Sequence, residues 1–164
     1  MKALIVEDDS RIASAMAQWL TDAGCEVAVT HSLEEAESFI RNDSVNVITL
    51  DLNLSDSNHG QTVERIERIR TYRPNAVLIV VSGIATINDE KDLQRRGADA
   101  LIEKMEVPTE RSFFGRLSDI ANALMGKKHD FSRNTEALAR FARMAARRCN
   151  ELGCGIAERL SGKH

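Results

Sequence analysis

Polar side chains stand directly after four of the apolar runs in this 164-residue chain. Glu7 and Asp8 follow the first run, Asp51 follows the third, Ser82 ends the fourth and Lys104 follows the fifth. If these runs are neighbouring parallel strands, the side chains meet at one edge of a sheet, because ligands of open α/β sheets bind at the carboxyl ends of strands. The sequence therefore predicts one acidic site with a hydroxyl and an ammonium group beside it.

Three carboxylates held close together repel one another. A fold tolerates Glu7, Asp8 and Asp51 side by side only if a cation compensates their charge or if their pKa values rise. An all-oxygen ligand set suits Mg²⁺, which prefers octahedral oxygen ligands and keeps several waters. We expect neither zinc nor copper, because we find no histidine or cysteine next to these acids. The acids predict a magnesium site.

A carboxylate in such a site can attack phosphorus and form an aspartyl phosphate. The transferring group carries charge on three oxygens, and each oxygen needs a partner. The metal ion, Lys104, and the Ser82 hydroxyl with nearby backbone N–H groups would supply these partners. No separate base is needed, because an ionised carboxylate is already nucleophilic. The residue types therefore favour phosphoryl transfer.

Strand-like and helix-like segments alternate along the chain, which is typical of a parallel sheet covered on both faces. The first helix is expected to begin at Asp9 or Ser10, either of which suits an N-cap, and to end at Gly24. Ser32 opens a Ser-x-x-Glu capping box for the second helix. A fourth helix, about 87–96, has few large apolar residues, so we expect it to pack least firmly. The strands are predicted at about 3–6, 26–30, 45–50, 76–81 and 99–102.

The charge of the chain is unevenly distributed. Residues 127–164 carry nine Lys/Arg and four Asp/Glu, whereas residues 1–126 are net acidic. We therefore expect a domain over 1–126, followed over 127–164 by a linker and a basic amphipathic helix with a frayed end. The apolar stripe of this helix comprises Leu138, Phe141, Ala145, Cys149 and Leu152.

The stripe needs a cover, either the domain's own surface or a second chain, so a homodimer through this helix is one expectation. Nucleic-acid binding is disfavoured, because the main domain is acidic and the basic segment is too short for a helix-turn-helix.

The sequence also carries indications of location. No run approaches the roughly 20 apolar residues that span a bilayer, and the start of the chain lacks the pattern of a signal peptide. We interpret Cys25, Cys149 and Cys154 as reduced thiols. These features predict a cytoplasmic protein with no membrane insertion.

The motifs resemble those of the receiver domain of two-component response regulators, the CheY-like family, over roughly residues 1–125. Glu7 and Asp8 look like the family's acidic pair, and Asp51, 44 residues after Glu7, looks like its phosphoacceptor. Ser82 and Lys104, 22 residues apart, match the family's Ser/Thr and Lys positions. The resemblance implies a flavodoxin-like (βα)5 fold, a doubly wound five-stranded parallel sheet of strand order 2-1-3-4-5, here with an extra C-terminal helix.

The resemblance also implies roles for individual residues. Asp8, Asp51 and the backbone carbonyl of Asn53 would bind Mg²⁺ directly, and Glu7 would act through a water molecule. A sensor histidine kinase or phosphotransfer protein would supply the phosphoryl group to Asp51. Output would be a contact with a downstream protein, for which the C-terminal helix is a candidate lever. Such a receiver is not an enzyme beyond slow self-catalysed phosphorylation and dephosphorylation.

Three positions depart from the family pattern. Leu101 stands where the family often has Tyr or Phe, Met105 follows Lys104 in place of the usual Pro, and the loop after Asp51 lacks a Pro and reaches Gly60 one residue late. These departures leave open a receiver-like interaction module that does not signal by phosphate. A Mg²⁺-dependent phosphohydrolase is a further alternative, disfavoured because we find no plausible cap and no second acid for the leaving group.

Overall fold

The computed structural model describes residues 1–55, 59–83, 87–104, 109–126 and 135–153. The strands are β1 (Lys2–Val6), β2 (Glu26–Thr30), β3 (Val47–Asp51), β4 (Val77–Ser82) and β5 (Ala100–Glu103). The helices are α1 (Ser10–Asp22), α2 (Leu33–Asn42), α3 (His59–Tyr72), α4 (Ile87–Arg96), α5 (Glu110–Gly126) and α6 (Thr135–Glu151). The strands form one parallel sheet in the order β2-β1-β3-β4-β5. The predicted topology is confirmed.

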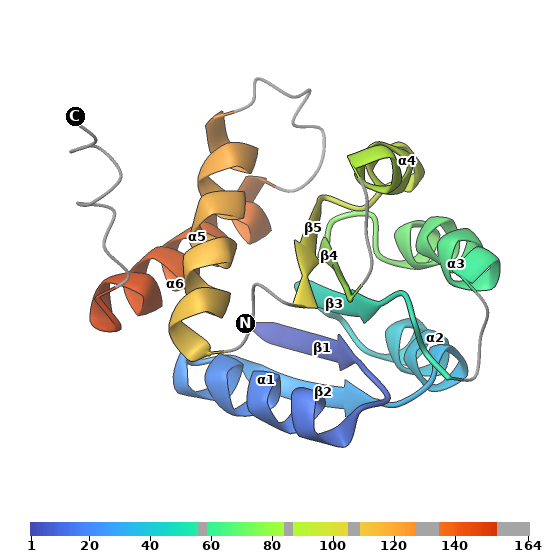
Figure 1. Cartoon of the computed structure of the whole chain (residues 1–164), viewed down its shortest axis with the longest axis horizontal. Helices are drawn as coiled ribbons and strands as arrows, with labels where there is room; N and C mark the ends of the chain where they lie inside the picture. Colours follow the sequence, from blue (N-terminus) through green and yellow to red (C-terminus); the bar gives the residue numbers. More distant parts are fainter. Residues whose placement is uncertain (56–58, 84–86, 105–108, 127–134, 154–164) are drawn as a thin grey trace.

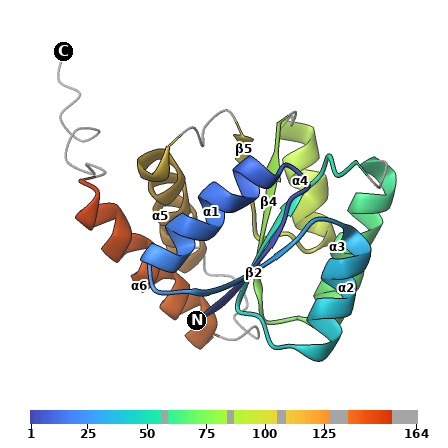
Figure 2. The same ribbon diagram turned by 90° about the horizontal axis from the view of Figure 1, so that it is seen from below.

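Each strand contributes alternate side chains to two apolar layers, because successive side chains of a strand point to opposite faces. In β1, Ala3 and Ile5 belong to the first layer, and Leu4 and Val6 belong to the second. Helices α1, α5 and α6 pack with the first layer, and α2, α3 and α4 pack with the second. Figures 1 and 2 show these two groups of helices on opposite sides of the sheet. The sheet is thus buried on both faces, as its continuous apolar runs predicted.

Local capping fixes the two helices that begin beside the acidic residues. The Asp9 carboxylate caps α1 by accepting from the N–H groups of Arg11 and Ile12 at 2.9 and 3.4 Å. The Ser32 hydroxyl caps α2 by accepting from the N–H of Glu35 at 3.1 Å. Helix α1 ends before Gly24, whose φ of +89° suits a residue without a Cβ. The caps predicted from the sequence therefore set where both helices start.

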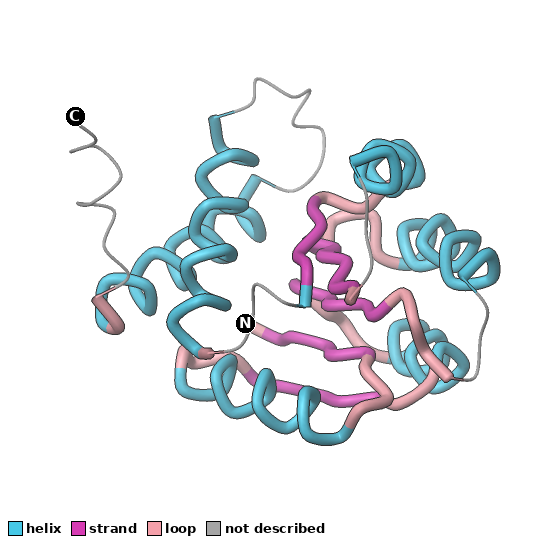
Figure 3. Tube along the Cα trace, in the orientation of Figure 1, coloured by secondary structure: helices cyan, strands magenta, loops and turns pink. Residues whose placement is uncertain are grey.

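The C-terminal helix α6 packs on α5 of the same chain. Phe141 and Ala145 are completely buried in the first layer, together with Phe113 and Phe114 of α5. Cys149 is also buried. Figure 3 shows α6 crossing behind α5, and the two helices are in contact. The chain's own surface thus covers the described part of the apolar stripe.

Two further observations concern membrane-spanning helices and the cysteines. No described helix is both long enough and apolar enough to cross a bilayer. Cys25 is a buried free thiol, and burial raises its pKa. Cys154 and the side chain of Leu138 lie outside the part of the structure that is described.

Candidate functional site

The predicted site residues come together at the carboxyl edge of the sheet. Glu7 and Asp8 follow β1, Asp51 ends β3, Ser82 ends β4 and Lys104 follows β5. The four strands are parallel and in register, so that β3 ends beside β4 and β4 ends beside β5. The structure therefore gathers on one edge residues that span almost a hundred positions of sequence.

Three carboxylates form the centre of the site. Glu7, Asp8 and Asp51 each offer an oxygen atom, and these atoms lie within 4.8 Å of one another. Glu7 and Asp51 are each only 2% exposed, and Asp8 is half-buried. Three acids at this spacing, two of them shielded from water, favour either a cation or a proton.

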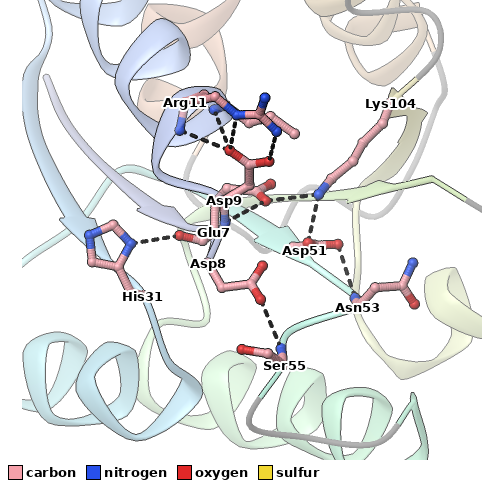
Figure 4. A network of polar contacts seen from close by, with 10 residues as sticks. Glu7, Asp8, Asp9, Arg11, His31, Asp51, Asn53, Ser55 and Lys104 are labelled. Atoms are coloured by element: carbon pink, nitrogen blue, oxygen red, sulfur yellow. Dashed lines mark hydrogen bonds and ion pairs between the residues drawn. The ribbon is translucent and has the colours of Figure 1, made fainter.

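Lys104 supplies one positive charge to this cluster. Its Nζ lies 2.8 Å from Glu7 Oε1 and 2.6 Å from Asp51 Oδ2, and Figure 4 shows the side chain reaching down between them. Burial works to lower the pKa of Lys104, but the hydrogen bonds to Asp51 and Glu7 outweigh it and raise that pKa. The ammonium group therefore stays charged and compensates one of the three acids.

The two acids after β1 respond differently to their surroundings. Burial raises the pKa of Glu7, with the charge of Asp51 adding to the effect, although the hydrogen bond from Lys104 opposes it. Partial burial also acts to raise the pKa of Asp8, but hydrogen bonds from Ser55 hold that pKa below its ordinary value. Asp8 is thus the better anionic ligand of the pair, and Glu7 is the one that resists ionisation.

The loop after β3 orients two of the carboxylates. Asp51 Oδ1 accepts from the N–H of Asn53 at 2.9 Å, and Asp8 Oδ2 accepts from the N–H of Ser55 at 3.0 Å. Figure 4 shows Asp8 turned toward Ser55 and Asp51 lying between Lys104 and Asn53. The metal-binding role of the Asn53 carbonyl stays a prediction. Ser82 is fully buried at the end of β4.

Sequence reasoning missed one residue beside the site. The ring Nδ1 of His31 lies 2.9 Å from the carbonyl oxygen of Glu7, on the opposite side from Lys104 (Figure 4). The N–H of Glu7 in turn donates to the carbonyl of Thr30 at 3.1 Å. The register gives the reason, since Val6 pairs with Thr30, so that the residue after β2 must lie next to the residue after β1. The strand order alone would have placed His31 there.

Asp9 has a structural role in these surroundings. Its carboxylate caps α1 and forms an ion pair with Arg11, Nη2 to Oδ2, at 2.9 Å. The hydrogen bonds from Arg11 lower the pKa of Asp9 to about 2.

Met105 and residues 56–58 lie outside the described residues, so the expectations for the Lys104–Met105 peptide and for the loop before Gly60 stay predictions.

Comparison with known proteins identifies the family. The profile of the response regulator receiver domain matches residues 3–110. The chain belongs to this family. A curated relative, the photosynthetic apparatus regulatory protein RegA of Rhodobacter capsulatus, is 25% identical over 124 residues, which are 76% of this chain and 61% of that protein. The chain thus spans less than two thirds of that relative's length.

Two solved structures place the receiver fold in context. A CheY-like receiver domain protein from Methanospirillum hungatei is 27% identical, with a TM-score of 0.64 over 76% of this chain and 95% of that one. A response regulator from Burkholderia pseudomallei, solved with a phosphorylated aspartic acid, calcium ion and citrate, is 21% identical. It aligns with a TM-score of 0.63 over 96% of this chain and 99% of that one, so the likeness in fold extends into α6.

The family has a general chemistry and a general role in signalling. Phosphorylation on aspartate and signalling through kinases and downstream proteins are general to receiver domains. The cluster of Glu7, Asp8 and Asp51 is consistent with the divalent metal site of such domains.

Proposed function

We propose that Asp51 of this receiver accepts a phosphoryl group from a histidine kinase or phosphotransfer protein, with Mg²⁺ bound beside it. The observation that carries the proposal is the position of Asp51, 2% exposed, with Oδ2 at 2.6 Å from Lys104 Nζ and an oxygen within 4.8 Å of those of Glu7 and Asp8. It is the one acid of the three that both Lys104 and the loop after β3 hold in place.

The residues fit a magnesium ion. All three acids offer oxygen, Lys104 balances only one of them, and the hydrogen bonds from Ser55 keep Asp8 anionic. When bound, Mg²⁺ would offset the negative charge of the carboxylates and of one phosphoryl oxygen. Asp8 and Asp51 would hold the ion directly, together with the Asn53 carbonyl, and Glu7 would act through a water molecule.

The remaining residues would carry the transfer itself. A carboxylate oxygen of Asp51 attacks phosphorus, and an O–P bond forms as the P–N bond to the donor's imidazole breaks, with the bonding electrons returning to the ring. Lys104 and the Ser82 hydroxyl neutralise or hydrogen-bond the phosphoryl oxygens as charge redistributes over them. No described residue has to act as a general base, because the nucleophile is already ionised.

A small phosphodonor with Mg²⁺ tests this reaction. We expect a mass gain of one phosphoryl group that is acid-stable and base-labile, that needs the divalent cation, and that disappears in Asp51→Asn. Asp119→Asn, which changes an exposed aspartate of α5, is the matched control and should be labelled like the wild type. A gain that survives Asp51→Asn would place the acceptor elsewhere.

The same experiment separates the two alternatives. Absence of labelling would favour a receiver-like interaction module that works without phosphate, which the leucine at position 101 motivates. A phosphohydrolase would release phosphate rapidly over many turnovers, whereas the proposed receiver, once the donor is removed, would slowly release the single phosphoryl group that it carries. We propose that the protein is not a turnover enzyme.

The output is proposed to be a contact with a downstream protein in the cytoplasm. A homodimer through the stripe of α6 would require Phe141 and Ala145 to leave α5, because both are fully buried within one chain. Light scattering with and without residues 127–164 tests this, since a dimer mass that depends on the tail would support the homodimer.

A further inference from the structure

One arginine connects α6 to two other helices. Arg148 Nε and Nη2 lie 2.8 and 2.5 Å from Oε1 of Glu110, the first residue of α5. Nη2 also lies 4.0 Å from Oδ2 of Asp22, the last residue of α1, and Nη1 lies 3.1 Å from Glu151 Oε2. The side chain is only 19% exposed, so these are partly desolvated contacts. We refer to Arg148, Glu110 and Asp22 as the clamp.

Other arginines of α6 do not share this position. Arg140, Arg143 and Arg147 are exposed on the outer face of the helix. Arg147 is 64% exposed and pairs with Glu151 of its own helix at 3.2 Å. Arg148 and Arg147 are therefore neighbours of equal charge, and in the described part of the chain only Arg148 of the two pairs with a residue of α5.

The clamp lies close to the acidic site in sequence. Lys104 contacts Asp51 directly, and Glu110 follows Lys104 by six positions as the first residue of α5. One turn further, Phe113 contacts Trp19 of α1 with ring centroids 5.5 Å apart. Within the described residues the site and the helix pair are also linked through β5, because Ile102, two positions before Lys104, lies in the first layer with Phe113 of α5 and Phe141 of α6.

A phosphoryl group on Asp51 conflicts with the present position of Lys104. The ammonium nitrogen lies 2.6 Å from Oδ2, which leaves no space for a phosphoryl group between them. A phosphoryl group on Oδ2 makes the lysine give up this contact, and a phosphoryl group on either carboxylate oxygen brings a new charge of about −1.5 to −2 near the ammonium group. The hydrogen bonds from Arg148 to Glu110 weaken steeply when they are misaligned, so a reorientation at the start of α5 would weaken them.

We propose that the clamp holds the start of α5 in the arrangement that belongs to unphosphorylated Asp51, and that occupation of Asp51 loosens α6. This inference rests on the proposed function of the site. Packed helix interfaces switch between discrete arrangements more readily than they deform, which allows a local change to reach α6. The coupling is reciprocal, so that weakening the clamp strengthens binding of a phosphoryl analogue at Asp51.

Hydrogen exchange of the full chain tests the proposal, with Mg²⁺ and beryllofluoride as the phosphoryl analogue. In the wild type we expect peptides from residues 135–153 to exchange about fivefold faster when the analogue is bound, at the low end of typical coupling. In Arg148→Gln the same peptides should already exchange fast without the analogue, and adding the analogue should change their exchange little. This variant should also bind the analogue about fivefold more tightly than the wild type. Arg147→Gln should behave like the wild type.

The outcomes separate the inference from the function on which it rests. Fluorine NMR reports whether beryllofluoride is bound. A bound analogue with unchanged exchange in α6 would overturn the coupling and leave the proposed function intact. Absence of a bound signal would overturn the proposed function and this inference with it. If Arg148→Gln fails to fold, Glu110→Gln removes the same contact from the other side and should give the same exchange pattern.

Discussion

Replacing Phe141 by alanine tests whether α6 is an integral part of the receiver core. Phe141 is 0% exposed and lies in the first layer with Phe113 and Phe114. Removing a fully buried phenylalanine costs about 3–5 kcal/mol of unfolding free energy, from lost transfer energy and the cavity that remains. We expect about 3 kcal/mol, because the last helix of the described chain can relax toward the cavity.

The loss is measured by urea and thermal unfolding followed through Trp19, the single tryptophan of the chain, which contacts Phe113. For a protein of this length, about 3 kcal/mol corresponds to a fall in Tm of roughly 6–12 °C. Arg143→Ala, an exposed change in the same helix, is the control and should lie within about 0.5 kcal/mol of the wild type.

A loss below about 1 kcal/mol for Phe141→Ala would refute the reasoning, since it would mean that α6 contributes little to the core. A second informative outcome is a normal urea transition combined with fast hydrogen exchange confined to residues 135–153. That result would show that α6 opens separately while the rest of the fold stays intact.

Three further predictions concern the acidic site and a helix cap. Mg²⁺ at about 100 times its Kd should stabilise the wild type by about 2.7 kcal/mol in thermal unfolding, and Asp8→Asn should lose most of this gain. In metal-free buffer, the pKa of Glu7 is higher in the folded protein than its ordinary value of 4.5. Protonated Glu7 therefore contributes its full share of the unfolding free energy below pH 4.5, and this share is lost as the pH rises through the folded-state pKa. Urea titrations should therefore show the wild type losing stability toward neutral pH relative to Glu7→Gln, and parallel pH profiles would contradict this. Ser32→Ala should cost about 1 kcal/mol in urea unfolding through loss of the α2 cap, whereas Ser38→Ala on the exposed face of α2 should not.

The sheet was predictable because its evidence is local and repeated. Each strand is a short apolar run, and four of the five runs are followed by a polar site residue, which places those residues at one edge once the strands are parallel. The strand order itself came from the resemblance to receiver domains. Asp51, Ser82 and Lys104 could be assigned to one edge for this reason. The cap at Ser32 was also visible, because a capping box is defined by residues only three positions apart.

The contacts that were missed are those between segments far apart in sequence. Nothing local to His31 indicates a bond to the carbonyl of Glu7, and only the pairing of β1 with β2 brings the two together. The cover of α6 was likewise open between the domain's own surface and a second chain, because an amphipathic stripe does not specify its partner. Nothing local to Arg148 distinguishes it from the other arginines of α6, and only its contact with Glu110, 38 positions away in sequence, sets it apart.

The two layers of the fold also separate two routes by which a change at Asp51 can reach the surface of the domain. Leu101, at the position where receivers often have an aromatic residue, packs with the second layer, under α2, α3 and α4. Its neighbour Ile102 faces the first layer, where Phe113 and Phe141 lie. Because successive residues of β5 point to opposite faces, a change at 101 and a change in the α5–α6 pair act on different sides of the sheet. This chain lacks the aromatic residue on one side and carries an additional packed helix on the other, so the route through the first layer begins at Ile102, two residues before the lysine that contacts Asp51.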